Sequence, residues 1–463
     1  MSDTAALLDA LAALLGSGLV PGEAVEPRHM GDWMVPAEPG VRPLALALPR
    51  STEEVAGVLR LAHAHGIAVV PQGGLSGLAG GGTPTQGCLA LSLERMRAIE
   101  DLDPATGTIT VQAGVALQTI QEAADAAGFF YGVDLGGRGT CQAGGNIATN
   151  AGGNRVLRYG MTREQVVGIE VVLADGTIVS SLGKMLKNNA GYDLKQLFIG
   201  SEGTLGVITR AVLRLRPKPA SQCVALLALP AYDAVLDLLG RARSTLGDAL
   251  SAFEMMAPEF YALGTTALNR RPPLPPDQPF YGLIELLGND QAADEARLHA
   301  VVEAALADGV ALDAVAAQSP REVGELWRIR DCPGEWSQTW FWPQISFDIS
   351  IPTGRIGDFI VAARGRLLAE FPTAHAVFFG HVADSNLHLS VRVEPDPQPT
   401  HALEALVYAT VRDWQGSISA EHGIGLLKRD YLDHCRTPEE IQLMRTLKQA
   451  LDPKGILNPG KVL

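Results

Sequence analysis

Two short segments combine residue types that bind metal ions and transfer protons. The first, Phe379–Val391, contains His381, Asn386 and His388 among apolar neighbours. Apolar residues flank Asp384-Ser385, which we therefore predict to be a two-residue hairpin loop. With that loop, His381 pairs with His388, and the Cβ atoms of the two histidines would lie about 4.5–5.5 Å apart on one face of the hairpin. The side chain of Asn386 would lie on the same face. This spacing is suitable for two ligands of one divalent metal.

The second segment, Ser419–Gly425, contains Glu421 and His422. Because these two residues are adjacent, their side chains cannot face one point in the same way. One of them can bind a metal while the other has a different role. The alternative for any single histidine is packing in a β core with both ring nitrogens hydrogen-bonded, but three of the ten histidines fall in these two glycine-flanked motifs.

Three glycine-rich segments could bind a phosphorylated, flat ligand. Six of the twelve residues in Pro71–Gly82 are Gly, directly after an apolar run, so that backbone N–H groups can converge on phosphate oxygens, with Ser76 as a hydroxyl donor. The segment Asp134–Gly153 adds amide and hydroxyl groups, suited to a heteroaromatic ring. Gly200–Thr209 is a further glycine turn that leads into a strand.

The chain has neither a strict G-x-G-x-x-G nor a G-x-x-x-x-G-K-[ST] motif, which disfavours a nicotinamide Rossmann site and a P-loop NTPase. The glycine segments instead resemble the flavin-binding domain of the vanillyl-alcohol oxidase/p-cresol methylhydroxylase family. The resemblance is strongest to its FAD-linked D-2-hydroxyacid dehydrogenases, which act on D-lactate, D-2-hydroxyglutarate or glycolate, and runs from about residue 43 to residue 463.

This resemblance implies bound FAD, and because Gly73–Gly82 contains no His, the attachment is expected to be non-covalent. The residues it assigns to the cofactor fall into four groups: Gln72, Gly73, Gly74, Leu75, Ser76 and Gly77 at the pyrophosphate; Gly144, Gly145, Asn146, Thr149 and Asn150 at the isoalloxazine; Gly203, Gly206, Val207 and Ile208 on the adenine side; and Asn458 near the C-terminus.

The resemblance also implies the roles of the residues at the reaction centre. His381, His388 and Glu421 would bind the metal, and His422 would be the catalytic base. Zn²⁺ suits this ligand set, with Mn²⁺ and Fe²⁺ as alternatives. The substrate's 2-hydroxyl group would lose its proton to His422, and its Cα hydrogen would leave as hydride to the flavin.

A carboxylate substrate also requires a cation, and the resemblance favours Arg330, with Asn386 as a second substrate contact. Arg328 and Arg330 share a face on a strand but diverge on a helix. The alternative for Arg330 is a salt bridge with Glu325 or Asp331. The aromatic residues that follow could line the substrate pocket or pack in the core; they are Trp336, Trp340, Phe341 and Trp342.

One position departs from the family pattern. Ser346 stands where 2-hydroxyglutarate dehydrogenases tend to have a Lys for the second carboxylate. This favours a smaller or more apolar 2-hydroxyacid such as D-lactate. The electron acceptor is expected to be an electron-transfer flavoprotein, a quinone or a cytochrome. Alternatives are an O₂-using oxidase and a flavin subunit of a multi-subunit glycolate oxidase-like complex.

The elements that must position these residues indicate an α+β chain. We predict an N-terminal helical segment (1–36), a two-subdomain FAD-binding domain (37–217), an α+β substrate or cap domain (218–416) and a C-terminal segment that returns to the FAD domain (417–463). Ser51 or Thr52 begins a helix with Val55, Val58 and Leu59 at helical spacing. Further expected elements are strands at 67–71, 171–174, 178–180, 207–215 and 345–351, and a helix at 292–307.

Composition limits the classes of function. The chain has 463 residues, a net charge of −14 and 47% hydrophobic residues, which predicts two or three domains with sizeable cores. The acidic charge argues against a nucleic-acid binder. Five cysteines without a C-x-x-C motif indicate reduced thiols in a cytoplasmic protein. The apolar stretch 5–15 is expected to be an amphipathic helix. Because the sequence has no apolar run of 18 or more residues, we predict no transmembrane helix. Peripheral membrane association and a homodimer are left open.

Overall fold

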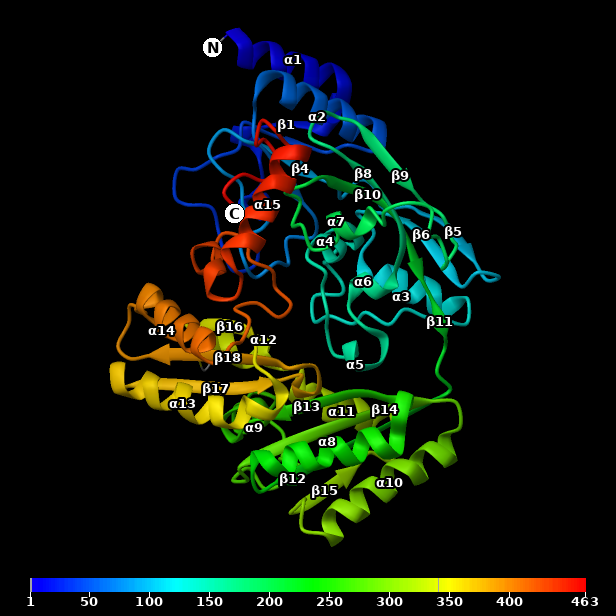
Figure 1. The fold of residues 1–463 in the computed structure, drawn as a ribbon, viewed down its shortest axis with the longest axis vertical. Coiled ribbons are helices and arrows are strands. Elements are labelled where there is room, and N and C mark those ends of the chain that lie inside the picture. The colour runs from blue at the N-terminus through cyan, green and yellow to red at the C-terminus, as the bar shows by residue number, and fades with distance from the viewer. Residues whose placement is uncertain (1, 340) are drawn as a thin grey trace. The chain divides into compact units, whose positions relative to one another are not determined.

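A computed structural model describes residues 2–339 and 341–463 (Figure 1). The described chain divides into two compact units. The first consists of residues 1–153, 160–218 and 421–463, and the second of residues 154–159 and 219–420. The N-terminal helix is part of the first unit, and so is the C-terminal segment, which returns to it after an excursion of about two hundred residues.

The first subdomain of the first unit is a small sheet with strand order β1-β2-β4-β3. Helices α1 and α2 pack on it, and the buried side chains Leu7, Leu11, Val55 and Leu59 form part of their shared core. Ser51 is the N-cap of α2, because its hydroxyl accepts the N–H of Glu54. The elements are α1 (Ser2–Leu15), β1 (Leu19–Pro21), β2 (Ala45–Ala47), α2 (Thr52–His65), β3 (Val69–Gln72) and β4 (Leu89–Ser92).

The second subdomain is an antiparallel sheet with strand order β5-β6-β10-β8-β9. Its helices α3 and α4 bury Leu117, Ile120 and Ile147 against the strands. The elements are β5 (Ile99–Asp103), β6 (Thr108–Gln112), α3 (Leu117–Ala126), β7 (Phe129–Phe130), α4 (Ala143–Ala148), α6 (Thr162–Gln165), β8 (Val166–Val172), β9 (Ile178–Ser181), α7 (Lys195–Phe198), β10 (Val207–Arg214), β11 (Arg216–Pro217) and, near the C-terminus, α15 (Pro438–Leu451).

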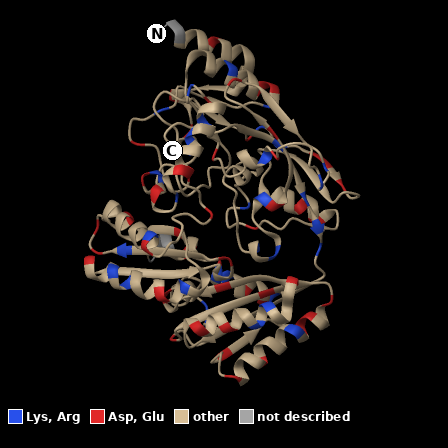
Figure 2. Cartoon of the chain, in the orientation of Figure 1, with Lys and Arg blue, Asp and Glu red and all other residues tan. Residues whose placement is uncertain are grey.

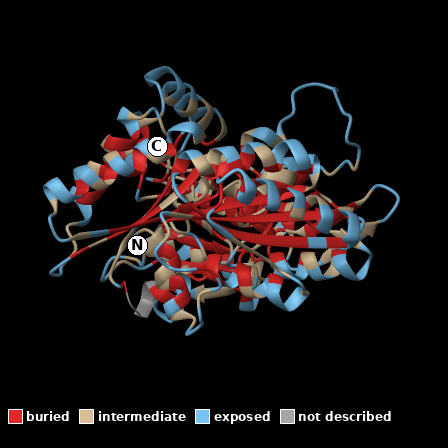
Figure 3. Cartoon of the chain, turned by 90° about the horizontal axis from the view of Figure 1, so that it is seen from below, coloured by how far each residue is buried: buried red, intermediate tan, exposed pale blue. Residues whose placement is uncertain are grey.

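The second unit is built on one antiparallel sheet with strand order β15-β12-β14-β13-β17-β18-β16. Figure 3 shows buried residues concentrated along its strands and exposed residues on the outer sides of the helices. Its elements are α5 (Val156–Tyr159), β12 (Ser221–Leu229), α8 (Tyr232–Leu246), β13 (Leu250–Met256), α9 (Pro258–Ala267), β14 (Phe280–Gly288), α10 (Gln291–Ala307), β15 (Asp313–Ala316), α11 (Pro320–Arg330), α12 (Pro333–Thr339), β16 (Ile345–Ser350), α13 (Ile356–Glu370), β17 (Ala374–Gly380), β18 (Asn386–Val393) and α14 (Thr400–Asp413).

Helices α9, α11 and α12 cover the sheet face that carries Leu226, Met256 and Leu283. On α8 and α10, acidic and basic residues are interspersed (Figure 2), and ion pairs such as Arg241–Asp237 join them along the surface. In the described chain, no helix combines the length and apolar character needed to cross a bilayer.

The predicted helices and strands are found at the expected places, but the strand predicted at 171–174 begins earlier, at Val166 (β8), and the predicted N-terminal helical segment 1–36 also contains β1, which pairs with β2. The α+β architecture is confirmed as well.

Candidate functional site

The first glycine segment is held by a glutamine–histidine pair. Gln72 is 1% exposed, and its Nε2 donates to the carbonyl oxygens of His29 and Gly82, both at 2.9 Å. Since Nε2 faces two carbonyls, Oε1 accepts from Nδ1 of His29, also at 2.9 Å. The side chain of Gln72 therefore fixes the two ends of the glycine segment. His29 is a buried residue without a motif, so this role could not be predicted from the sequence.

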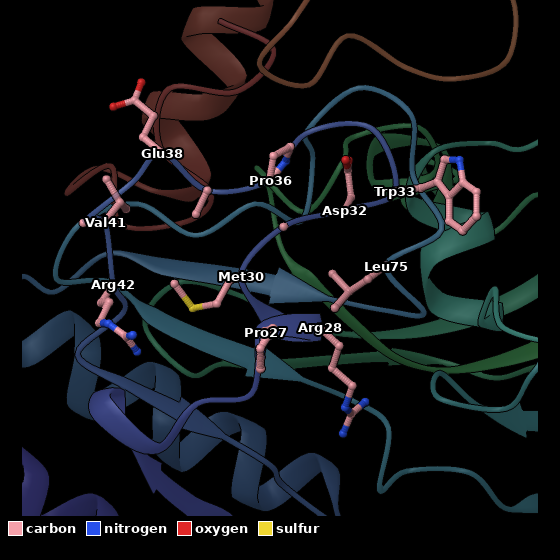
Figure 4. A pocket seen from close by; sticks show the side chains of 13 residues that line it. Pro27, Arg28, Met30, Asp32, Trp33, Pro36, Glu38, Val41, Arg42 and Leu75 are labelled. Carbon is pink, nitrogen blue, oxygen red and sulfur yellow. The ribbon is translucent and has the colours of Figure 1, made fainter. Parts of the chain in front are cut away.

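Asp32 shapes the same segment from the N-terminal side. Its carboxylate accepts the N–H groups of Val35 at 2.8 Å and Gly80 at 2.6 Å. Burial raises the pKa of Asp32, although these backbone hydrogen bonds oppose the rise. Figure 4 shows Asp32, Trp33 and Leu75 around a cavity of about 570 Å³ that is otherwise lined by residues 27–42. Leu75 has a positive φ of 55°, so the turn brings a side chain, and not a glycine, to the cavity wall.

The first and second glycine segments approach each other backbone to backbone. A Cβ atom added to Gly73 would lie 3.5 Å from Cα of Gly145, and one added to Gly74 would lie 1.8 Å from the carbonyl oxygen of Thr140. A Cβ at Gly74 has no room unless the backbone moves. Glycine is therefore required at Gly74 by this close approach.

Most of the polar side chains predicted at the isoalloxazine form hydrogen bonds with nearby protein groups. Thr149 donates to the carbonyl oxygen of Gly145 at 3.0 Å, and Asn150 accepts the N–H of Arg163 at 2.9 Å. Asn146 is buried beside Cys141. Gly144 donates its N–H to Ala113 at 2.8 Å. These residues hold the turn of α4 in place, and Gly145 faces the first glycine segment.

The residues predicted on the adenine side lie at the start of β10. Gly203 has a φ of 71° and packs on Pro71, and Gly206 packs against Val171 and Phe198. Val207 and Ile208 are core residues on opposite faces of the strand. Their side chains are used in packing, so these two positions would offer a ligand chiefly their backbone.

The C-terminal segment joins the glycine segments together. Asn458 Nδ2 donates to the carbonyl oxygens of Gly81 at 3.0 Å and Glu202 at 2.8 Å, which bridges the first and third segments. The carboxylate of Glu202 accepts the N–H groups of Ile424 and Gly425 at 2.7 and 2.8 Å. Burial raises the pKa of Glu202.

Glu421 is tied to the second glycine segment. Its Oε1 accepts the N–H of Gly153 at 2.7 Å. His422 follows directly and is partly buried. The loop that carries His422 is therefore braced on both sides, by Gly153 before it and by Glu202 after it.

Buried acceptor atoms in the first unit fit a ligand rich in hydroxyl and N–H donors. Within the described chain, Oε1 of Gln142 and Oδ1 of Asn458 are buried and accept no hydrogen bond. Gln142 and Thr140 also line a cavity of about 840 Å³, whose wall includes the cations Arg50, Arg95 and Arg97. The ribityl and ribose hydroxyls, the flavin N3–H and the phosphates of FAD match these groups.

In the second unit, the prediction of a two-residue hairpin is wrong. β17 ends at Gly380, and a 3₁₀ turn (Val382–Asp384) and Ser385 follow before β18 begins. His388 is therefore paired with Phe379, and not with His381. A type I′ loop needs positive φ at both central residues, which Asp384-Ser385 does not provide; only Ser385 has one, 73°. The imidazoles still lie together, with ring centroids 5.5 Å apart.

His381 is held between a buried carboxylate and Arg330. Its Nδ1 lies 2.6 Å from Oε1 of Glu254, and its Nε2 lies 3.1 Å from Nη2 of Arg330. Arg330 Nε donates in turn to Oε2 of Glu254 at 2.6 Å. Glu254 lies on β13, and the sequence contains no motif around it.

His388 lies beside a second buried carboxylate. Its Nδ1 is 3.8 Å from Oδ1 of Asp348, the residue opposite it on β16. Asp348 also accepts Nδ2 of Asn386 at 2.9 Å and the N–H of Ala420 at 3.1 Å. Within the described chain, Oδ1 of Asn386 is buried and accepts no hydrogen bond. A donor such as an alcohol would satisfy it.

Of the arginines and aromatic residues near residue 330, some are buried and others are exposed. Arg328 and Arg330 lie on helix α11, so they diverge: Arg330 is 5% exposed and Arg328 is on the surface. Trp336 packs edge-on against Phe260 and Phe341, which is ordinary core packing. Trp342 is 58% exposed, and Trp340 lies outside the described residues.

Comparison with known proteins matches two family models to the chain, one on each side of residues 182–217. Residues 43–181 match the model of an FAD binding domain, and residues 218–462 match the C-terminal domain of FAD linked oxidases. The chain is 42% identical to the mitochondrial D-2-hydroxyglutarate dehydrogenase of Bos taurus, over 98% of this chain and 83% of that protein. It is 40% identical to the D-2-hydroxyglutarate dehydrogenase of Xanthomonas citri pv. viticola, over 95% and 93% of the two chains.

The chain belongs to the FAD-linked D-2-hydroxyacid dehydrogenases. These are oxidoreductases that act on CH–OH donors. A putative mitochondrial D-lactate dehydrogenase of Schizosaccharomyces pombe is also similar, at 38% identity over 93% of this chain and 83% of that protein.

Solved structures confirm the fold of this dehydrogenase. p-Cresol methylhydroxylase with bound substrate superposes with a TM-score of 0.79 at 17% identity, over 100% of this chain and 97% of that one. An alkyldihydroxyacetonephosphate synthase superposes with a TM-score of 0.77 at 18% identity, over 98% and 86%. The expected vanillyl-alcohol oxidase type of fold is thus confirmed.

Proposed function

We propose that this dehydrogenase oxidises D-2-hydroxyglutarate to its 2-oxoacid and passes the electrons to an acceptor other than oxygen. The observation that carries the proposal is the polar face of the second unit, where Arg330, two imidazoles and the unpaired Oδ1 of Asn386 lie on and beside one sheet. The choice of substrate rests on the names of the relatives.

Three residues would bind the substrate and move its proton. The guanidinium group of Arg330, a planar donor, suits the C1 carboxylate. Oδ1 of Asn386 would accept from the 2-hydroxyl group. His422 would take the hydroxyl proton, because an imidazole with an ordinary pKa of about 6.5 can accept a proton near neutral pH.

His381, His388 and Glu421 would hold a divalent metal. In support, Nδ1 of each imidazole faces a buried carboxylate, Glu254 or Asp348, so that Nε2 would be the ligand atom, and at His381 the metal would replace the hydrogen bond from Arg330. Chain connectivity also supports it: Ala420, next to Glu421, is bound to Asp348, and consecutive Cα atoms are about 3.8 Å apart. Two nitrogens and a carboxylate suit Zn²⁺, with Mn²⁺ and Fe²⁺ as alternatives; such an ion acts as a Lewis acid toward the hydroxyl group.

FAD, when bound, supplies the hydride acceptor of the reaction. The chain would hold it without a covalent bond through the backbone of the glycine segments, and through Gln142 and Asn458. The remaining residues assigned to the cofactor support these backbones by the packing described above.

A smaller substrate such as D-lactate is a second candidate. Ser346 is opposite Ser390 in the sheet, and their hydroxyl oxygens are 3.3 Å apart. Two rungs from Asp348 and His388, on the same face of the sheet, the strands thus carry two small neutral side chains in place of a cation. This would favour an acid without a second carboxylate.

The deciding experiment follows flavin bleaching without oxygen while the D- and L-forms of 2-hydroxyglutarate and lactate, and achiral glycolate, are added separately. Fastest bleaching by D-2-hydroxyglutarate is the expected result. Failure of every D-2-hydroxyacid to bleach the flavin would contradict the proposed function. Peroxide formed in air, compared with dye reduction, separates the dehydrogenase from an oxidase. A chain that binds FAD but reduces no dye would instead be a subunit of a larger complex.

A further inference from the structure

Glu254 joins two groups that come from distant parts of the chain. It is 0% exposed on β13 and binds Arg330, 76 residues away, through one oxygen and His381, 127 residues away, through the other. Both contacts are 2.6 Å long. A buried carboxylate with a cationic partner and a second donor is fully engaged, so it holds both partners in a defined geometry.

The contacts around His381 determine which ring nitrogen carries the proton. Arginine nitrogens only donate hydrogen bonds, so Nε2 of His381, 3.1 Å from Nη2 of Arg330, must present its lone pair. The proton of the neutral ring is therefore on Nδ1, where it is donated to Glu254. An imidazole in this tautomer carries its lone pair on Nε2, which would bind a metal in exchange for the hydrogen bond from Arg330.

We propose that Glu254 is a positioning residue for the reaction centre: one carboxylate oxygen fixes the tautomer and ring orientation of His381, and the other fixes the guanidinium group of Arg330. The inference rests on the proposed function, because it assigns His381 to the metal and Arg330 to the substrate. Because the single carboxylate of Glu254 contacts both His381 and Arg330, a substitution of Glu254 is expected to affect metal binding and substrate binding together.

The substitution Glu254→Gln tests this because an amide cannot replace both oxygens. Its nitrogen donates, so it must face either the Nε–H of Arg330 or the Nδ1–H of His381, and one contact is lost. Glu254→Asp keeps two acceptor oxygens on a shorter side chain and should restore part of the effect. The matched control is Glu285→Gln. Glu285 is a buried carboxylate of the same sheet that binds Arg155 at 2.8 Å.

The first readout is Zn²⁺ affinity, measured on the flavin-loaded protein after removal of metal by competition with a chromophoric chelator. Glu254→Gln should weaken Zn²⁺ binding about 10- to 100-fold, as is typical for the carboxylate behind a histidine ligand. Glu254→Asp should fall between it and the wild type. Glu285→Gln should lower the melting temperature without changing Zn²⁺ affinity.

The second readout is the tautomer of His381, obtained from ¹⁵N shifts of histidine-labelled protein, with His381 assigned by its loss in a variant. The wild type should show a protonated Nδ1, and Glu254→Gln should show a mixture of tautomers. The third readout is KM for the hydroxyacid, which should rise in Glu254→Gln with the loosened Arg330.

Unchanged Zn²⁺ affinity, tautomer and KM in a folded Glu254→Gln variant would overturn the inference. So would an equal loss of Zn²⁺ affinity in Glu285→Gln, because the effect would then be one of general stability. The failure of the proposed function looks different: the wild type itself would bind no divalent metal, or would oxidise no D-2-hydroxyacid.

Discussion

Glu421 accepts a 2.7 Å hydrogen bond from the N–H of Gly153, although 268 residues separate them in the sequence. This contact fixes the residue before His422 to the end of the second glycine segment. The proposed base is therefore positioned by the same backbone that is assigned to the cofactor. The contact with Gly153 is made through Oε1 of Glu421.

The substitution Glu421→Gln should separate this contact from the proposed metal binding. A glutamine oxygen can still accept the N–H of Gly153, so FAD content and melting temperature should stay close to wild type, but a neutral amide is a poor metal ligand and turnover should fall at least tenfold. FAD absorbance, thermal unfolding and turnover are measured together. If Glu421→Gln retained full turnover, Glu421 would not be a metal ligand.

The substitution Gly74→Ala should impair cofactor binding. Its Cβ would lie 1.8 Å from the carbonyl oxygen of Thr140, so the two glycine segments must move apart. Overpacking of this kind costs about 1–3 kcal/mol. The purified wild type should be yellow and should release its flavin on acid precipitation, and Gly74→Ala should hold less. The control is Gly136→Ala, because a Cβ at Gly136 meets nothing within 4 Å. Equal flavin content in all three proteins would contradict the assignment.

The substitutions His381→Ala and His388→Ala should abolish turnover while FAD stays bound, because the histidines lie in the second unit and the glycine segments in the first. Prolonged chelation should have the same effect, reversed by adding Zn²⁺, Mn²⁺ or Fe²⁺ separately. His375→Ala is the control, since His375 is an exposed histidine on β17. Activity that survives exhaustive chelation would exclude the metal.

The substitution Arg330→Ala should raise KM and also lower stability. It removes the cation proposed for the substrate carboxylate and leaves Glu254 without its charged partner, and removing one member of a buried pair costs about 3–5 kcal/mol. Arg328→Ala, on the exposed side of the same helix, should change neither quantity. Steady-state kinetics and denaturant unfolding give the two values. An unchanged KM in a folded Arg330→Ala variant would assign carboxylate binding to another residue.

The contribution of Lys461 to stability should depend on pH above neutrality. Burial lowers the pKa of Lys461 from 10.5 to about 8, while its Nζ donates to the carbonyl oxygen of Thr83. Between pH 8 and 10.5 the unfolded chain binds the proton more strongly than the folded chain, so the free energy of unfolding gains up to about 3 kcal/mol as pH rises.

This pH effect is measured as the difference between wild type and Lys461→Met, from denaturant curves at several pH values. The difference should grow in favour of the wild type between pH 8 and 10.5. Lys454→Met controls for the loss of a lysine–carbonyl hydrogen bond, since exposed Lys454 donates to His63. A difference that is constant with pH would show that the folded pKa is not lowered.

The sequence predicted the parts of the site that rest on local signals. Ser51 begins α2 because its hydroxyl caps a backbone N–H three residues on, and glycine density identified the segments in which backbones approach closely. The family resemblance assigned FAD. The hairpin register was wrong because apolar flanks do not fix loop length, and a 3₁₀ turn with a left-handed Ser385 shifted the pairing by two residues.

The residues that orient the site could not be predicted from the sequence. Glu254, Asp348 and Asp32 are single carboxylates without a motif, Glu202 lies in the third glycine segment without a predicted role, and the partners of all four are supplied by tertiary packing. Glu254 and His381 are 127 residues apart, and Glu202 and Gly425 are 223 apart. Val207 and Ile208 remain predicted at the cofactor, but alternation along β10 places their side chains in two cores, which leaves chiefly their backbone for a ligand.

The hydrogen bonds between Val69 and residues 456–458 join two segments that the ribosome makes at very different times. Val69 donates to Ile456 at 2.7 Å and accepts from Asn458 at 2.8 Å, so the strand that leads into the first glycine segment completes its edge only after residues 456–458 have been translated. Flavin uptake is therefore expected to follow the translation of residues 456–458. A nascent chain halted before residue 456 is expected to emerge colourless.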